Sequence, residues 1–420
     1  MRFKILVFIL VLPVLVFAEE FYTLDELLLH ALENNTTLKQ SNLDLDIARA
    51  RLGAARVNYL PDLSAGLNRT HSYDNIHFDG ERIQNFAQFS VIKNIALNNE
   101  AYFSNRNARH DLSSAEIMNE IQRQNIIYDV IQNYISVLEN QMRIALLEEN
   151  IAIQESIVFE SNQLFRQQRI TQFEVQQSEI NLLNARISAL NARNNLTVSR
   201  NLLFDLINKP DTGLALAEVD LFAEVDLDDF AREINFDQIL RVRADNIASQ
   251  RHRTSITRTR LNFFPQMNLQ YNYRRRVFSE DLEFNHGMTD HSIGLNLSYS
   301  LNDLFRNRFT YRQVQSLDEH NQLGTGQLLR NIALRHNQFV EELNFLHELI
   351  ELQELRAQQT AQNLAMAQQR FRLGLVTQLD IDKAIFENHD SQIGLASSRY
   401  QLMMKKLQID YLLSTGLRGF

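Results

Sequence analysis

The chain has 420 residues, among them 12 glycines, 4 prolines and no cysteine or tryptophan. Average usage at this length would be about 29 glycines and about 21 prolines, so turns are few and the elements between them are long. The net charge of -9 argues against a nucleic-acid-binding surface, the absence of cysteine excludes disulfides and thiolate metal sites, and 45% apolar residues exclude wholesale disorder. Composition therefore predicts an ordered chain in which helices dominate.

The first segment, residues 1–18, is predicted to be a secretory signal peptide. Two basic residues, Arg2 and Lys4, precede an apolar run over residues 5–17, and Ala18 stands at the expected cleavage site. The run is shorter than the roughly 20 apolar residues of a spanning helix. An uncleaved N-terminal anchor is the alternative. No later stretch approaches spanning length, so the mature chain is expected to leave the cytoplasm without a transmembrane helix.

The mature chain is predicted to contain two structural repeats, residues 19–208 and 238–420. Residues 165–175 match residues 371–381, and the strand entry at Pro61 has a counterpart at Pro265. Both pairs have nearly the same offset, about half of the mature chain, which indicates a tandem duplication. Each repeat is expected to hold a helix, two strands, a very long helix, a reversal and a returning helix.

Four segments alternate apolar and polar residues as membrane β-strands do. We expect two strands near residues 62–95 and two near residues 265–302. The alternation is weakest over residues 87–95, because Ile92 and Lys93 break its phase. The polar face consists almost entirely of Asn, Gln, Ser and Gly and would suit a watery lumen. A soluble sheet packed against the helices is the alternative.

If these strands cross a membrane, one chain is not enough to form the barrel. Four strands cannot close, and open strand edges are not tolerated in lipid. The smallest bacterial barrels have about eight strands. Several chains must then share one barrel, and three copies would supply twelve strands around a lumen wide enough for solutes.

The first long helix is predicted from near Ala101 towards Phe165, and its apolar residues recur by sevens as in a coiled-coil seam. One series is Ile121, Tyr128, Ile135 and Met142, and the other is Ile131, Leu138, Ala145, Ala152 and Phe159. The second repeat has the series Leu343, Ile350, Ala357, Leu364 and Phe371, beside Phe339 and Leu346. A helix of about 65 residues is a rod about 100 Å long.

Residues 209–237 are predicted to be an acidic linker between the repeats. A turn at residues 209–213 is followed by the acidic residues Glu218, Asp220, Glu224, Asp226, Asp228 and Asp229. A solvated connector is favoured over a calcium site, because residues 226–229 lack the spacing of a calcium-binding loop.

No pattern in the sequence predicts an enzyme or a cofactor site. His71 and His77, or His286 and His291, fall in predicted loops without helical metal-ligand spacing. Residues 324–326, Gly-Thr-Gly, lack the lysine of a phosphate-binding loop and more simply mark a bend or a close contact in a long helix. No nucleophile elbow occurs. We therefore expect no catalysis, no cofactor and no nucleic-acid partner.

Several loose motifs follow one another in a specific order. They are residues 31–35 with Leu38, the Ala/Arg-rich residues 48–56, the strand entry at residues 60–63, residues 371–380, Tyr400 and residues 412–416. In this order, and with the duplication, the chain resembles the TolC family of outer-membrane efflux proteins. The resemblance implies a mainly α fold with a small β part. Long antiparallel coiled-coil helices would form an α-barrel in the periplasm, and four strands per chain would join a trimeric twelve-stranded barrel in the outer membrane.

The resemblance also implies a function and partners. It points to the outer-membrane channel of a tripartite efflux or type I secretion system, a passive homotrimeric duct for solutes or proteins. Its partners would be a periplasmic adaptor, an inner-membrane RND or ABC transporter, and outer-membrane lipid. A secreted periplasmic coiled-coil scaffold without a pore is the alternative, and such a scaffold would extract into buffer without detergent.

In the family, the two reversals are periplasmic tips where the adaptor docks and the pore closes. The docking candidates are Gln168, Arg169, Ile170 and Thr171 near residues 167–172, and Gly374, Leu375, Val376 and Thr377 near residues 373–378. Gln168 stands where the family has glycine. Asp380 matches a carboxylate of the closed aperture, Glu174 matches the acidic position of the first tip, and Lys383 replaces a second carboxylate. Asp380 could equally be a solvated residue in the first turn of a helix.

Overall fold

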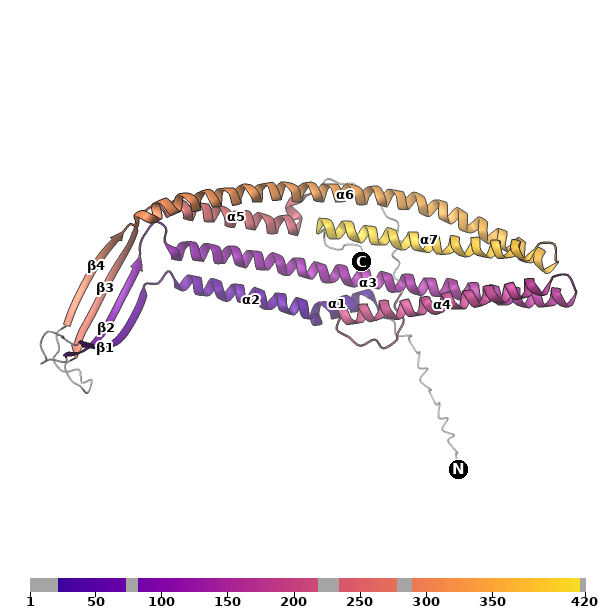
Figure 1. The fold of residues 1–420 in the computed structure, drawn as a ribbon, viewed down its shortest axis with the longest axis horizontal. Coiled ribbons are helices and arrows are strands. Elements are labelled where there is room, and N and C mark those ends of the chain that lie inside the picture. Colours follow the sequence, from indigo (N-terminus) through magenta and orange to yellow (C-terminus); the bar gives the residue numbers. More distant parts are fainter. Residues whose placement is uncertain (1–21, 73–81, 218–233, 278–288, 416–420) are drawn as a thin grey trace, which may run out of the picture.

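The computed structural model describes residues 22–72, 82–217, 234–277 and 289–415. Figure 1 shows an elongated molecule with a sheet at one end and two helical hairpin tips at the other. The predicted signal peptide, the acidic residues 218–229 of the predicted linker, His77 and His286 lie outside the described residues. Within the described ranges, no helix has the length and apolar character needed to cross a membrane.

The sheet is antiparallel throughout and has the strand order β1-β2-β3-β4. Its strands are β1 (Asp62–Ser72), β2 (Arg82–Asn94), β3 (Gln266–Val277) and β4 (Thr289–Ser298). The four predicted strands are thus confirmed, but the fourth is shorter than expected. It ends at Ser298 rather than near residue 302, because Ser300 caps a helix that begins at Leu301 and accepts the Asp303 N–H.

The strand register places the apolar residues of all four strands on one face, except Phe86 and Ile92 of β2, which lie on the polar face. Phe89 of β2 lies opposite Ala65 of β1 and Tyr273 of β3, and Leu269 of β3 lies opposite Leu295 of β4. The pairing runs without interruption, so the two-residue alternation keeps its phase from strand to strand. The expected irregularity in β2 is present: Lys93 falls on the apolar face, where its ammonium donates to the Tyr59 carbonyl.

The remaining structure consists of helices that pair into hairpins. They are α1 (Leu24–Asn34), α2 (Thr36–Val57), α3 (Glu100–Arg166), α4 (Gln172–Leu206), the short 3-10 helix η2 (Phe236–Gln238), α5 (Leu240–Leu261), α6 (Leu301–Arg372) and α7 (Gln378–Leu413). With 67 and 72 residues, α3 and α6 are each about 100 Å long. α3 packs against α4, and α6 against α7, while α2 and α5 run beside them towards the sheet.

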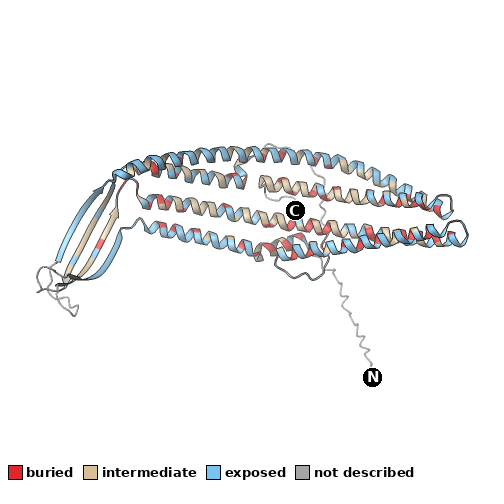
Figure 2. Ribbon diagram, in the orientation of Figure 1, coloured by how far each residue is buried: buried red, intermediate tan, exposed pale blue. Residues whose placement is uncertain are grey.

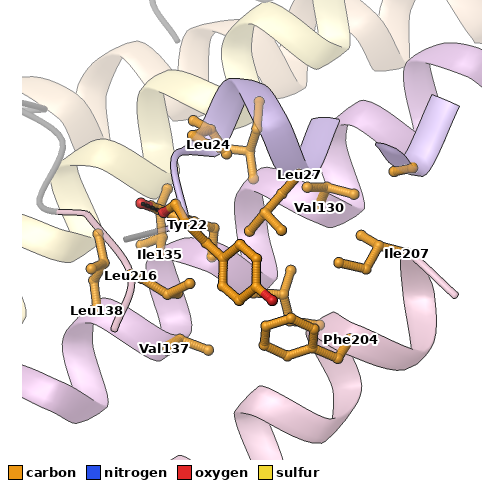
Figure 3. Packing of buried hydrophobic residues seen from close by; sticks show 14 of the residues in the cluster. Tyr22, Leu24, Leu27, Val130, Ile135, Val137, Leu138, Phe204, Ile207 and Leu216 are labelled. Carbon is orange, nitrogen blue, oxygen red and sulfur yellow. Dashed lines mark hydrogen bonds between the residues drawn. The ribbon is translucent and has the colours of Figure 1, made fainter. Parts of the chain in front are cut away.

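The largest apolar core lies midway along the molecule, where α1, α3, α4 and α7 meet (Figure 3). Tyr134 is fully buried there, and its hydroxyl donates to the Ala217 carbonyl. Burial raises the pKa of Tyr134 to about 12. The first residues of the predicted linker pack against this core, because Arg200 forms a two-pronged ion pair with Asp211 and Leu216 is buried.

Within the single chain, the predicted heptad residues of α3 are fully buried only up to Leu138. Ile131, Ile135 and Leu138 are buried, but later members of both series are exposed within the chain: Met142, Ala145, Ala152 and Phe159. Leu147, Ile157 and Leu164 are buried in their place. The buried face therefore changes phase where α3 leaves the crowded midsection and packs mainly against α4. In α6, Leu343, Leu364 and Phe371 of the first predicted series are buried, and so is Leu346 of the second.

Candidate functional site

The second hairpin tip turns through a glycine in the left-handed conformation. α6 ends at Arg372, and Gly374 has φ 64. The Gly374 N–H donates to the Phe371 carbonyl at 2.8 Å, and the Leu375 N–H donates to the Arg370 carbonyl at 2.9 Å. These two bonds satisfy carbonyls that the end of α6 would leave without partners, and they reverse the chain within a few residues.

The first tip has the same backbone geometry without glycine. Gln168 has φ 60, and its N–H donates to the Phe165 carbonyl at 2.8 Å. The Arg169 N–H donates to the Leu164 carbonyl at 2.9 Å. A side chain in this region costs about 1–2 kcal/mol relative to glycine. The first tip thus has glutamine where the family has glycine, but its turn has the same backbone geometry as that of the second tip.

Each returning helix begins with the same reciprocal cap. The Glu174 carboxylate accepts from the Thr171 N–H at 2.7 Å, and the Asp380 carboxylate accepts from the Thr377 N–H at 3.0 Å. In return, each threonine hydroxyl accepts the N–H of its acidic partner. The Thr377 hydroxyl and N–H hold the pKa of Asp380 below its usual value. Asp380 is therefore a helix-capping residue, whatever else it does in the assembled protein.

Lys383 stands beside Asp380 in a groove of about 390 Å³ between α6 and α7. Arg370 lines the same groove, and the Lys383 ammonium lies 3.8 Å from the Glu387 carboxylate. All three predicted aperture candidates are exposed or only partly buried. Asp380 and Lys383 come together in the groove, whereas Glu174 belongs to the other tip.

Polar contacts join the two tips to each other. The Arg169 guanidinium donates to the Leu373 carbonyl, across from one tip to the other. Arg372 at the end of α6 donates to the Glu160 carboxylate of α3 at 2.6 Å, and this glutamate side chain is only 13% exposed. The Ser161 hydroxyl of α3 donates to the Gln378 amide oxygen of α7 at 3.2 Å.

An apolar cluster lies directly beneath these contacts. Its buried members come from α3, α6 and α7: Ile157, Leu164, Leu364, Phe371, Ile381, Ala384 and Ile385. Ile170 and Val376, two of the predicted docking residues, pack against this cluster from the two tips. Both side chains therefore contribute to the packing beneath the tips rather than to the outer surface of the tips. Leu375, by contrast, is 68% exposed and lies at the surface of the second tip.

Sequence reasoning missed several residues at this end of the molecule. Phe173 and Leu379 are both exposed and occupy equivalent positions at the start of α4 and α7. The repeat itself could have identified this pair. Asp382 was also missed: burial between helices raises its pKa, although Gln378 and Asn181 donate hydrogen bonds to it. No local pattern distinguishes Asp382 from a solvated helix residue.

The described residues contain no group of three or more histidine and acidic side chains that could hold a metal ion. The Gly-Thr-Gly segment of α6 makes a helix contact, since Thr325 donates to the Asp245 carboxylate of α5. That contact is one of the two interpretations that the sequence left open.

A family model described as outer membrane efflux protein matches residues 27–209 and 240–414. The chain belongs to the outer membrane efflux protein family. The predicted resemblance to TolC-family proteins is thereby confirmed. The two matched segments lie on either side of the predicted linker, and together they include every helix of the hairpin tips.

Solved outer-membrane channels share the fold of this efflux family member. The channel OprN aligns with a TM-score of 0.84 and 14% identity, over 94% of this chain and 90% of its own. VceC of Vibrio cholerae aligns with a TM-score of 0.79 and 16% identity, over 93% of this chain and 95% of its own. CmeC of Campylobacter jejuni aligns with a TM-score of 0.81 and 15% identity, over 94% of this chain and 86% of its own. No curated protein sequence matches the chain.

The family assignment determines where this efflux protein is located and its general class. It lies in the outer membrane and extends a helical part into the periplasm. Its family and its structural relatives are channels rather than enzymes, so outer-membrane efflux is its function in general terms.

Proposed function

We propose that this efflux protein is the outer-membrane channel of a tripartite efflux or type I secretion system. It would act as a passive homotrimeric duct that carries solutes or proteins from an inner-membrane pump across the periplasm and the outer membrane. The observation that carries the proposal is the sheet, which has four strands, one apolar face and two unpaired edge strands in a protein of the outer membrane.

The edges of this sheet favour assembly. β1 and β4 have neighbours on one side only, and both are exposed along their described lengths (Figure 2). Unpaired backbone groups are not tolerated in a bilayer, so these edges require strands from other copies. Three chains with four strands each would close a twelve-stranded barrel, with Leu63, Leu269 and Leu295 among the side chains on its lipid-facing surface.

The helices offer a second surface for another copy of the chain. Small residues on one side of α4, including Ala185 and Ala189, are buried against α3. The opposite side carries exposed apolar residues at heptad spacing: Phe173, Ile180, Ile187, Leu183 and Leu190. A seam of this kind stabilises a coiled coil only when a partner helix covers it. We infer that the neighbouring protomer covers it in the periplasmic α-barrel.

The hairpin tips are the proposed docking surface for the adaptor. Leu375 and Leu373 are exposed at the second tip, and Phe173 and Leu379 are exposed on the helices that follow the two turns. The Arg169 guanidinium of the first tip occupies the space that a side chain on Gly374 would fill, so a partner that docks there would meet both hairpins. The adaptor would in turn connect the duct to an RND or ABC transporter, which would supply the energy for export.

Asp380 is the proposed aperture residue, in addition to its capping role. Its carboxylate carries two hydrogen bonds from Thr377 and remains exposed to solvent. In a trimer, three such carboxylates around a narrow aqueous path would favour cations. Lys383 would weaken that preference, because it brings a positive charge into the same groove.

The contacts between the two tips are the proposed latch of the closed state. The bonds from Arg372 to Glu160, from Arg169 to the Leu373 carbonyl and from Ser161 to Gln378 hold the α6–α7 hairpin against α3 and the first tip. Moving that hairpin outward would break all three. An adaptor opens such a pore only if it binds the open arrangement more tightly than the closed one.

Membrane fractionation followed by mass measurement in detergent tests the assembly. The duct requires detergent for extraction and yields a trimer, whereas a pore-less periplasmic scaffold would extract into buffer. Crosslinking to the adaptor in intact cells tests the docking surface. Gly374→Glu should abolish the crosslink while trimers remain, and Gly213→Glu, at an open left-handed turn far from the tips, should leave both unchanged.

A further inference from the structure

The charged residues on the apolar face of the sheet are all basic. Among the described positions of that face, the only Lys, Arg, Asp or Glu side chains are Arg69 of β1, Lys93 of β2 and Arg275 of β3. The acidic residues Asp62 and Asp290 lie on the polar face, because they alternate with Leu63 and with the apolar-face positions of β4. A membrane-facing surface with charges of one sign only attracts the opposite charge.

The two arginines lie at the end of the sheet away from the helices. Arg275 shares a cross-strand row with Leu67, Ala87 and Thr289. Arg69 lies in the next row outward on the same face, opposite Asn85 of β2. β1 and β3 flank β2, so the two arginines are about 10 Å apart across the strands. Long guanidinium side chains on this spacing can reach the same lipid headgroup or two adjacent ones.

Aromatic residues lie one row inward from Arg275. The Tyr273 ring centroid is 5.0 Å from that of His291, and the Tyr271 hydroxyl lies 3.0 Å from His291 Nδ1. Arg275 therefore lies nearer the outer end of the sheet than either tyrosine of β3, and Arg69 lies one row farther out.

The depth of Arg275 agrees with this placement. Eight residues separate Met267 from Arg275, which is about 27 Å along a strand and about 20 Å of depth at the usual tilt of a barrel strand. The apolar band of an outer-membrane barrel is about 25 Å tall. From this level a guanidinium group can extend into the headgroup layer at low cost.

We propose that Arg69 and Arg275 form a binding site for the phosphate groups of an anionic lipid in the outer leaflet of the outer membrane. The proposal rests on the proposed function, since only in a closed barrel does this face meet lipid. Guanidinium groups bind phosphate through paired hydrogen bonds, and a trimer carries three such sites. Lys93 lies at the opposite end of the sheet, where its ammonium donates to the Tyr59 carbonyl.

Arg274 provides a matched control one residue away. It lies on the polar face, pairs in register with Asp290, and its guanidinium carbon is 5.4 Å from the centroid of the Phe86 ring. Arg274→Gln removes the same charge at the same depth, but from the face that the barrel turns towards its lumen.

The test uses purified protein in nanodiscs of phosphatidylcholine with or without bisphosphorylated lipid A, and native mass spectrometry counts the lipid A retained. Wild type should retain it, and Arg69→Gln/Arg275→Gln should weaken retention about tenfold or more, since each basic residue near a headgroup contributes about 1 kcal/mol. Arg69→Lys/Arg275→Lys should keep part of the effect, and Arg274→Gln should match wild type.

Equal retention by wild type and Arg69→Gln/Arg275→Gln, or an equal loss in Arg274→Gln, would overturn the lipid site. Displacement of lipid A by inorganic phosphate alone would do so too, because it would make the ligand a free ion. Conductance of the same nanodisc-derived trimers separates this failure from that of the proposed function. Conducting trimers that ignore lipid A refute only the lipid site, whereas a preparation that never forms trimers refutes both.

Discussion

The two hairpin tips have one backbone geometry but different residues. Gly374 has φ 64 and Gln168 has φ 60. In each tip a threonine three residues later, Thr377 or Thr171, caps the returning helix. The difference lies in the contact between the tips. A Cβ atom on Gly374 would overlap the Arg169 guanidinium, whereas Gln168 is exposed to solvent.

This difference assigns the tips separate roles. The first tip supplies a donor, Arg169, and the second supplies the space for it and an acceptor, the Leu373 carbonyl. A side chain at position 374 would therefore displace the Arg169 guanidinium, whereas the side chain at position 168 is exposed to solvent. Hydrogen exchange at the amides of the two turns measures the free energy of local opening at each tip and can test this assignment.

The largest effect is expected for Gly374→Gln, which gives the second tip the residue of the first. The left-handed backbone and the displaced Arg169 together should lower the local opening free energy of the second tip by about 2–3 kcal/mol. In an Arg169→Ala background the clash is absent, so the same substitution should cost about 1–2 kcal/mol. Equal costs in the two backgrounds would mean that Arg169 does not need the space.

A smaller effect is expected for Arg372→Gln, which removes the ion pair with Glu160. Glu160 is nearly buried but Arg372 is 60% exposed, so screening by solvent limits the loss to about 1–2 kcal/mol. Hydrogen exchange should rise at both tips. Glu160→Gln/Arg372→Gln should recover part of the loss, because no uncompensated carboxylate remains. Faster exchange at one tip alone would contradict a latch between them.

Thr377→Ala should lower the local opening free energy of the second tip by about 1 kcal/mol through loss of the cap of α7, and Thr171→Ala should do the same for α4 at the first tip.

The Asp380 cap should also depend on pH. The pKa of Asp380 is lowered from 3.8, so its stabilisation is complete above that value and is lost as pH falls through the lowered pKa. In Asp380→Asn, exchange at the second tip should no longer respond to acid. An unchanged acid response in Asp380→Asn would assign the titration to another group.

The smallest effect is expected for Gln168→Gly, which gives the first tip the residue of the second. Relief of the left-handed conformation should stabilise the first turn by about 0.5–1 kcal/mol, after the greater flexibility of glycine in the open state is subtracted. Slower exchange at the Gln168 and Arg169 positions is the expected observation. Destabilisation would show that the Gln168 side chain makes a contact that the turn needs.

The sequence predicts the fold of this protein well because both signals are periodic. Two-residue alternation identifies all four strands, and the tandem repeat locates both tips. After Leu138 the predicted heptad residues of α3 are not buried within the chain, because one sequence does not reveal which neighbour covers each face of this helix. Ser300 ends β4 early because a helix cap is a local signal that overrides the alternation. The link from Arg372 to Glu160 joins residues far apart in the chain, so no spacing rule predicts it.

Conductance of the purified protein in a planar bilayer tests the central claim most directly, namely that three chains form a duct held closed at its tips. Small, cation-selective current steps are predicted for wild type, with larger steps for Arg372→Gln because the latch is weakened. Inserted trimers that carry no current in either form would contradict the duct. Equal steps in both forms would leave the duct in place and contradict its closure by the contact between Arg372 and Glu160.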